Sequence, residues 1–97
     1  MINKLRGTGR TTQQLKALPL NAIYISCNHS CIYYDTQLTR MLNRRDIQVV
    51  GPDWVTSMRW QGLTYSAIEV DHAYPDVSRR TALFYEYLQR ARTRVRP

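Results

Sequence analysis

Two spacings of hydrophobic residues alternate along this chain, and together they predict its secondary structure. Segments 22–26 and 46–50 are rich in apolar and β-branched residues and have the length of short β-strands. Segment 22–26 is apolar at consecutive positions up to Ser26, which is typical of a central strand covered on both faces. A third strand is expected within 63–70, immediately before Asp71 and His72.

Segments with a helical spacing of apolar residues separate these strands. The first, Gln13 to Leu18, must end by Pro19 because proline lacks a backbone N–H and restricts the residue before it. The second covers about 33–45. Its predicted inward face consists of Leu38, Met41, Leu42 and Arg45, and its predicted outward face of Gln37, Arg40 and Arg44.

Two further helices are predicted in the second half of the chain. One is capped by Asp53 and ended by Gly62. The last begins at Asp76 or Ser78 and carries the clearest amphipathic pattern of the sequence. Its apolar stripe consists of Phe84, Tyr87, Leu88, Ala91 and Val95.

The alternation of helices and strands predicts an α/β fold. We expect a single domain over residues 1–97 with a basic C-terminal helix. Its fold should be three-layer-like, with helices flanking a short, mostly parallel three-stranded sheet. Right-handed crossovers in such a sheet would place a ligand at the carboxyl ends of the strands.

The charge of the chain indicates an acidic partner. The net charge is +7 and the isoelectric point about 9.9, which favours nucleic acid or an acidic protein surface. Segment 79–97 holds six arginines against the single Glu86, so most of the excess charge lies there. These candidate partner or nucleic-acid contacts are Arg79, Arg80, Arg90, Arg92, Arg94 and Arg96. The alternative is a solvated helix face with a basic end.

Five tyrosines are expected to offer aromatic surface beside this charge: Tyr33, Tyr34, Tyr65, Tyr74 and Tyr85.

Glycines and arginines near the start of the chain form a candidate anion site. In the run RGTGRTT at 6–12, the glycines allow a close approach of the backbone, and a helix start would present N–H groups to a phosphate. The alternative is a basic turn with no ligand. The candidate phosphate- or anion-binding residues are Arg6, Gly7, Gly9, Arg10, Thr11 and Thr12.

This run resembles the second half of a P-loop, with Arg10 in place of the usual lysine, and it is similar to a run in small bacteriophage proteins of P-loop type. It departs from the full pattern at Lys4, where a glycine is required. The strand that ends at Asp71 resembles a Walker B element, although Glu69 interrupts its apolar run, and this resemblance makes Asp71 a candidate Mg²⁺ ligand. The resemblance implies a reduced P-loop domain of nucleotide-binding ancestry.

The two cysteines do not indicate a disulfide framework. Cys27 and Cys31 lie four positions apart, and we expect both to be reduced thiols. Together with His29 and His72 they would complete a zinc set of two cysteines and two histidines. The pattern instead favours purely structural roles, with Cys27 at the end of a strand, His29 in a turn and Cys31 near the start of a helix.

These features predict a binding protein rather than an enzyme, because no catalytic base or water-positioning residue can be named beside the incomplete P-loop. The resemblance implies a phage-type protein that inhibits or modulates a host DNA-processing or defence complex through an acidic protein surface. The alternatives are direct DNA or RNA binding, and a minimal P-loop protein that binds nucleotide with Mg²⁺. Otherwise no cofactor is expected. No apolar run is long enough to span a membrane, which favours the cytoplasm, that of the host if the protein is phage-encoded.

Overall fold

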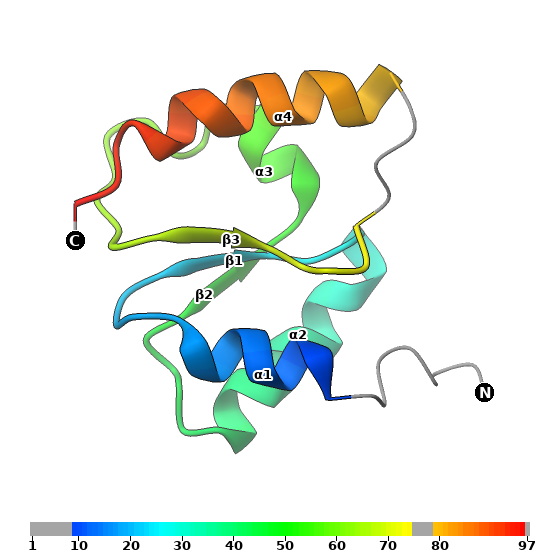
Figure 1. Cartoon of the computed structure of the whole chain (residues 1–97), viewed down its shortest axis with the longest axis vertical. Coiled ribbons are helices and arrows are strands. Elements are labelled where there is room, and N and C mark those ends of the chain that lie inside the picture. The colour runs from blue at the N-terminus through cyan, green and yellow to red at the C-terminus, as the bar shows by residue number, and fades with distance from the viewer. Residues whose placement is uncertain (1–8, 75–78, 97) are drawn as a thin grey trace.

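Three short parallel strands form the centre of the fold (Figure 1). The computed structural model describes residues 9–74 and 79–96. The strands are β1 (Ile23–Ile25), β2 (Gln48–Val50) and β3 (Ile68–Val70), in the spatial order β2-β1-β3. Both pairs are parallel, with Tyr24 opposite Val49 on one side and Glu69 on the other. The predicted α/β class and the short parallel sheet are therefore confirmed.

Helices cover both faces of this sheet. One face carries α1 (Arg10–Ala17) and α2 (Ile32–Met41), and the other carries α3 (Pro52–Thr56) and α4 (Arg79–Arg92) (Figure 1). A 3₁₀ turn, His29–Cys31, precedes α2. No helix in the described segments is long and apolar enough to cross a bilayer.

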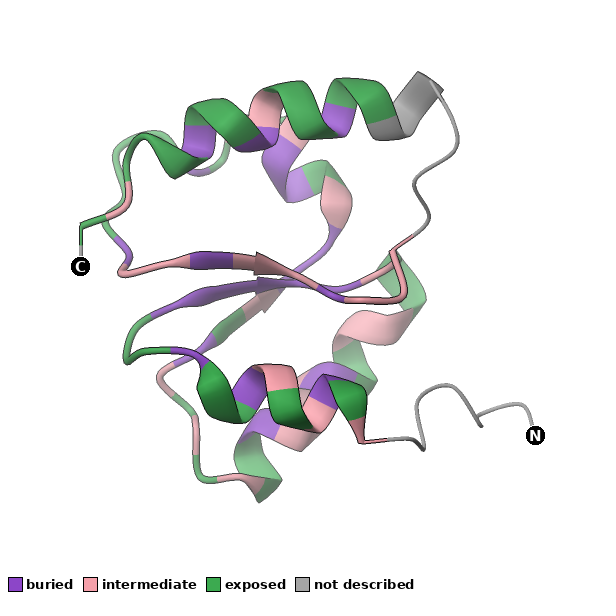
Figure 2. Cartoon of the chain, viewed as in Figure 1, coloured by how far each residue is buried: buried purple, intermediate pink, exposed green. Residues whose placement is uncertain are grey.

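The central strand β1 is buried on both sides, as its composition predicts (Figure 2). Because side chains alternate along a strand, Ile23 and Ile25 point toward the α3–α4 face and Tyr24 points toward the α1–α2 face. The apolar core is thereby divided into two clusters, one on each face of the sheet. The α3–α4 cluster contains most of the predicted stripe of the last helix: Phe84, Leu88 and Ala91 are buried, and Tyr87 and Val95 pack against them.

Two helix starts differ from the sequence prediction. The first helix begins at Arg10 rather than Gln13, because Gly9 adopts a left-handed conformation (φ 83°) that turns the chain directly into the helix. In α3, Gly51 occupies the N-cap and Pro52 the first position, so Asp53 lies inside the first turn and does not cap the helix. This helix also ends at Thr56, well before Gly62.

The predicted faces of the second helix are also wrong in part. Met41 is 79% exposed, and Arg45 is exposed as well. The buried positions of α2 are polar, Asp35 and Thr39. Asp35 is accommodated because the Ser26 hydroxyl donates a hydrogen bond to its Oδ2 at 2.7 Å.

Arg44, predicted to point outward, is half-buried and joins two segments. Its guanidinium donates to the carbonyl of Leu15 at 3.1 Å and to that of Pro19 at 3.0 Å. The same group forms an ion pair with Asp46, with 3.0 Å between Nη2 and Oδ2. Arg44 therefore holds the last turn of α1 against the loop that leads into β2.

Candidate functional site

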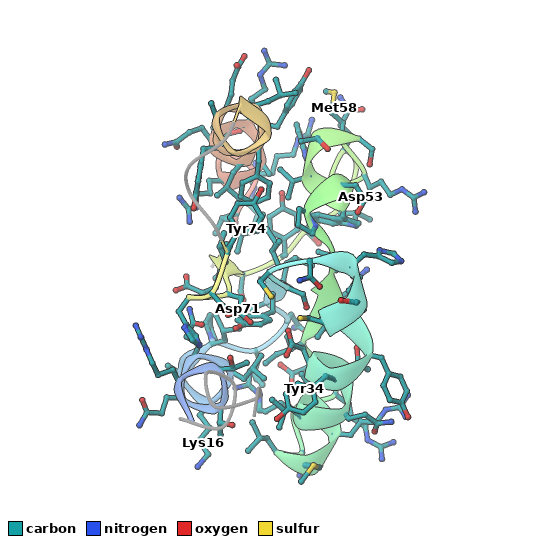
Figure 3. The ribbon with its side chains drawn as sticks, turned by 90° about the vertical axis from the view of Figure 1, so that its right-hand side faces the viewer. Lys16, Tyr34, Asp53, Met58, Asp71 and Tyr74 are labelled. Carbon is teal, nitrogen blue, oxygen red and sulfur yellow. The ribbon has the colours of Figure 1, made fainter. Side chains whose placement is uncertain are left out.

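The carboxyl ends of β1 and β3 lie at the end of the sheet where parallel α/β folds usually bind ligands, and we call this end the carboxyl edge. The chain leaves β1 toward α2 on one face of the sheet and leaves β3 toward α4 on the other face, so the two connections diverge there (Figure 1). The first turn of α1 lies at the same edge. Figure 3 looks onto this edge, with Asp71 above α1 and Tyr74 beneath α4.

The glycine-containing run contributes the start of α1 to this edge. Gly9 is the N-cap, Arg10 is exposed in the first position, and Thr12 is half-buried. Arg6 and Gly7 lie outside the described residues. Anion binding by this run stays a prediction.

The structure brings together the two segments that the sequence compares with P-loop elements. Thr11 is 1% exposed, and its Oγ1 lies 3.2 Å from Nε2 of His72, which is 61 positions away in the chain. The hydroxyl of Thr11 thus faces the strand end that the sequence compares with a Walker B element, rather than solvent.

Gln14, which the sequence analysis did not single out, links the same two segments. Its Nε2 donates to the carbonyl of Val70 at 3.0 Å. Its Oε1 accepts from the hydroxyl of Tyr24 and from the backbone N–H of His72, each at 3.0 Å. The available signal was its spacing, because Gln14 lies three positions after Thr11 and four before Leu18 on the inward side of α1.

Tyr24 is fully buried beneath this network. Burial raises the pKa of its phenol, and the negative charges of Asp71 and Asp35 raise the pKa further. Tyr24 is therefore a neutral hydrogen-bond donor at physiological pH, which fits its contact with the amide oxygen of Gln14.

Asp71 is 2% exposed and organises the turn after β3. Its Oδ1 accepts the backbone N–H of Ala73 at 2.8 Å, and its own N–H donates to the carbonyl of Ile25 at 2.8 Å. Nε2 of His72 lies 3.7 Å from the same Oδ1. Within 9–74 and 79–96, no three His, Cys, Asp or Glu side chains gather as metal ligands would. The role of Asp71 in Mg²⁺ binding stays a prediction.

The same finding bears on the candidate zinc set. Cys27 and Cys31 lie close together, with 3.2 Å between their sulfur atoms, but His72 contacts Thr11 instead. Cys27 and His29 line a cavity of about 630 Å³ at this edge of the sheet. Pro52 and Asp53 line it from α3, and Tyr74 and Phe84 complete it on the side of α4.

The candidate arginines do not share one surface, because α4 spans the molecule. Its 14 residues extend about 20 Å, from the edge just described to the opposite edge (Figure 1). Arg79 and Arg80 open the helix, and their side chains lie outside the described part of the structure. The other four candidates lie near the opposite edge, at the end of the helix and just beyond it: Arg90, Arg92, Arg94 and Arg96.

Aromatic rings position part of this basic group. Arg94 lies over the ring of Trp60, with 5.6 Å from Cζ to the ring centroid, and Arg90 lies 5.0 Å from that of Tyr87. Arg90 also pairs with Glu86, at 3.9 Å between Nη2 and Oε2.

The tyrosines proposed as aromatic surface are dispersed. Tyr65 is buried, and its hydroxyl donates to the carbonyl of Ala91 at 2.7 Å, so it holds α4 in place. Tyr33 and Tyr34 are exposed on α2, on the other face of the sheet. Tyr74 and Tyr85 pack with each other, at 6.1 Å between ring centroids, near the opposite end of α4.

The chain matches no known family model, no curated protein sequence and no solved structure.

Proposed function

We propose that this chain is a small, non-catalytic protein that binds an acidic partner through one end of α4, and that it thereby acts on nucleic-acid machinery. The contact surface would be the arginine end, which we define as Arg59, Arg92, Arg94 and Arg96. All four side chains are exposed. Arg59 joins the group because it precedes Trp60, over whose ring Arg94 lies.

One observation carries this proposal. Among the described residues, no carboxylate lies within 4 Å of these four guanidinium groups, whereas Arg44 and Arg90 have acidic partners in the same chain. Guanidinium groups bind phosphate and carboxylate in a bidentate manner. Several of them without a carboxylate partner among the described residues supply the charge that an acidic surface requires.

The resemblance to small phage proteins favours an acidic protein surface of a host DNA-processing or defence complex as the partner. Direct binding to DNA or RNA is the alternative, since phosphates suit the same groups. The experiment is gentle purification from lysate with and without nuclease. A stoichiometric protein that survives nuclease treatment supports the first partner, and nucleic acid that is lost at high salt supports the second.

Variants make the assignment to the arginine end specific. Arg92→Ala with Arg96→Ala should remove the co-purifying partner, and Arg40→Ala with Arg45→Ala should retain it. The control pair is exposed, removes the same charge and lies on the opposite face of the sheet. Equal loss in both variants, or retention in both, would contradict the proposal.

A second candidate function is anion or nucleotide binding at the start of α1. It is favoured by the contact between Thr11 and His72, which joins the two P-loop-like segments. Arg10→Ala should weaken binding of a nucleoside triphosphate about tenfold or more in calorimetry, the cost of a charged hydrogen bond. Lys16→Ala is the control, because Lys16 is exposed at the other end of the same helix. Similar affinities for both variants would exclude a role for Arg10.

A further inference from the structure

Two thiols lie side by side at the carboxyl edge of the sheet. Cys27 follows β1 after one intervening residue, and Cys31 ends the 3₁₀ turn before α2. Their sulfur atoms are 3.2 Å apart, and both residues are half-buried, within reach of a small reagent. A disulfide bond requires about 2.0 Å, so the sulfurs need to move by only about 1 Å.

The turn between the two thiols is held by its own hydrogen bonds. The side-chain oxygen of Asn28 accepts the backbone N–H of Cys31 at 3.0 Å and the hydroxyl of Ser30 at 2.7 Å. On the strand side, Ser26 donates its hydroxyl to Asp35 at 2.7 Å and its N–H to Val50 at 2.9 Å. The sulfurs are thus positioned by ordered backbone on both sides, which raises the effective concentration of each thiol toward the other.

We propose that Cys27 and Cys31 are a reversible thiol–disulfide site, oxidised by a low-molecular-weight disulfide such as glutathione disulfide. The thiolate of one cysteine attacks the oxidant, forms a mixed disulfide and releases one glutathione thiolate. The second cysteine, as its thiolate, attacks the protein sulfur of that mixed disulfide and releases the second glutathione. In total the two protein thiols lose two electrons and two protons, and one glutathione disulfide becomes two glutathiones.

The bond would act on the cavity at this edge. Cys27, Asn28 and His29 line it together with Tyr74 and Phe84. Closing a bond between residues 27 and 31 would restrain this part of the lining, so we expect the oxidation state of the pair to affect the shape of the cavity. This site lies at the opposite edge of the sheet from the arginine end, and its chemistry does not depend on the proposed partner.

The test equilibrates the full chain with reduced and oxidised glutathione, blocks remaining thiols with an alkylating reagent and measures the intact mass. The expected product has lost two hydrogens, carries no alkyl group and stays monomeric on a non-reducing gel. The second cysteine competes with reduced glutathione for the mixed disulfide. At an effective concentration of about 10 mM for this cysteine and about 1 mM glutathione, less than about a tenth of the chain remains as mixed disulfide. Cys27→Ser and Cys31→Ser should each retain one glutathione.

Asn28→Ala is the variant that keeps both thiols. Loss of the turn's hydrogen bonds should make the disulfide about fivefold less stable relative to the two thiols, the usual cost of a lost cap. Half-oxidation should therefore require a correspondingly more oxidising mixture of glutathione disulfide and glutathione. Circular dichroism shows whether each variant is folded. Two alkylated thiols, two separate glutathione adducts or a disulfide-linked dimer in the wild-type chain would each overturn the proposal.

Discussion

At the scale of single residues, Gln14 explains how α1 is joined to the end of β3. One amide side chain satisfies the carbonyl of Val70, the backbone N–H of His72 and the hydroxyl of Tyr24. Tyr24 is fully buried, and a buried polar group that loses its partner costs about 1–3 kcal/mol. A single side chain therefore supports a site whose segments are far apart in the sequence.

Replacing Gln14 by methionine keeps the length of the side chain and removes all three hydrogen bonds. Gln14→Met should lower the free energy of unfolding by about 2–4 kcal/mol in urea denaturation. Tyr24→Phe removes the hydroxyl that donates a hydrogen bond to Gln14. The loss of stability in the double variant should therefore be smaller than the sum of the losses in the two single variants. Additive losses would mean that this contact contributes nothing to stability.

At the scale of elements, Arg44 and Asp46 join the end of α1 to the loop before β2. The hydrogen-bonded guanidinium of Arg44 holds the pKa of the Asp46 carboxyl at about 2, below its usual range. In the unfolded chain this carboxyl titrates near its ordinary pKa of about 3.9. As the pH falls, the unfolded state therefore binds a proton first, and this contribution to stability is lost as the pH falls through about 2.

Asp46→Asn measures that contribution. Above about pH 5 the variant should be less stable than wild type by about 1–2 kcal/mol, a value limited by water because the side chain is 22% exposed. The difference in urea midpoint should shrink between about pH 4 and pH 2. Glu86→Gln is the control, because its pair with Arg90 is more than half exposed and should be worth less than about 0.5 kcal/mol. A pH-independent difference for Asp46→Asn would contradict this account.

The elements also show what the sequence could predict and why. The stripe of α4 and the buried run of β1 were predictable, because their spacing alone identifies the buried side chains. The inward face of α2 was not, because its buried side chains, Asp35 and Thr39, are polar, and the hydrogen bond from Ser26 that helps to accommodate Asp35 forms only in the folded chain. Met41 was assigned inward for its apolar side chain and is exposed.

The candidate site was predictable to a similar extent. The sequence identified Thr11 and Asp71 separately, and the parallel sheet predicted a site at the carboxyl ends of the strands. It did not identify Gln14, because the spacing places this side chain on the inward side of α1 but does not reveal its hydrogen-bond partners. Nor could it identify the proximity of the two sulfur atoms, which depends on the conformation of the 27–31 turn.

At the scale of the whole molecule, the fold of this chain of 97 residues places the candidate binding features at two opposite ends of the sheet. The start of α1, the turn after β3 and the paired thiols share the carboxyl edge of the sheet. The arginine end occupies the opposite edge (Figure 1). A ligand at one edge therefore leaves the other accessible, and the position of the basic charge matters more than its total.

A comparison at constant net charge tests this last point. Arg92→Ala with Arg96→Ala and Arg40→Ala with Arg45→Ala each lower the net charge from +7 to +5. On immobilised heparin, a polyanion, the first variant should elute at clearly lower salt than the second, because it removes two charges from the arginine end, whereas Arg40 and Arg45 lie on the other face of the sheet. Equal elution would mean that overall charge, rather than the arginine end, determines binding to acidic partners.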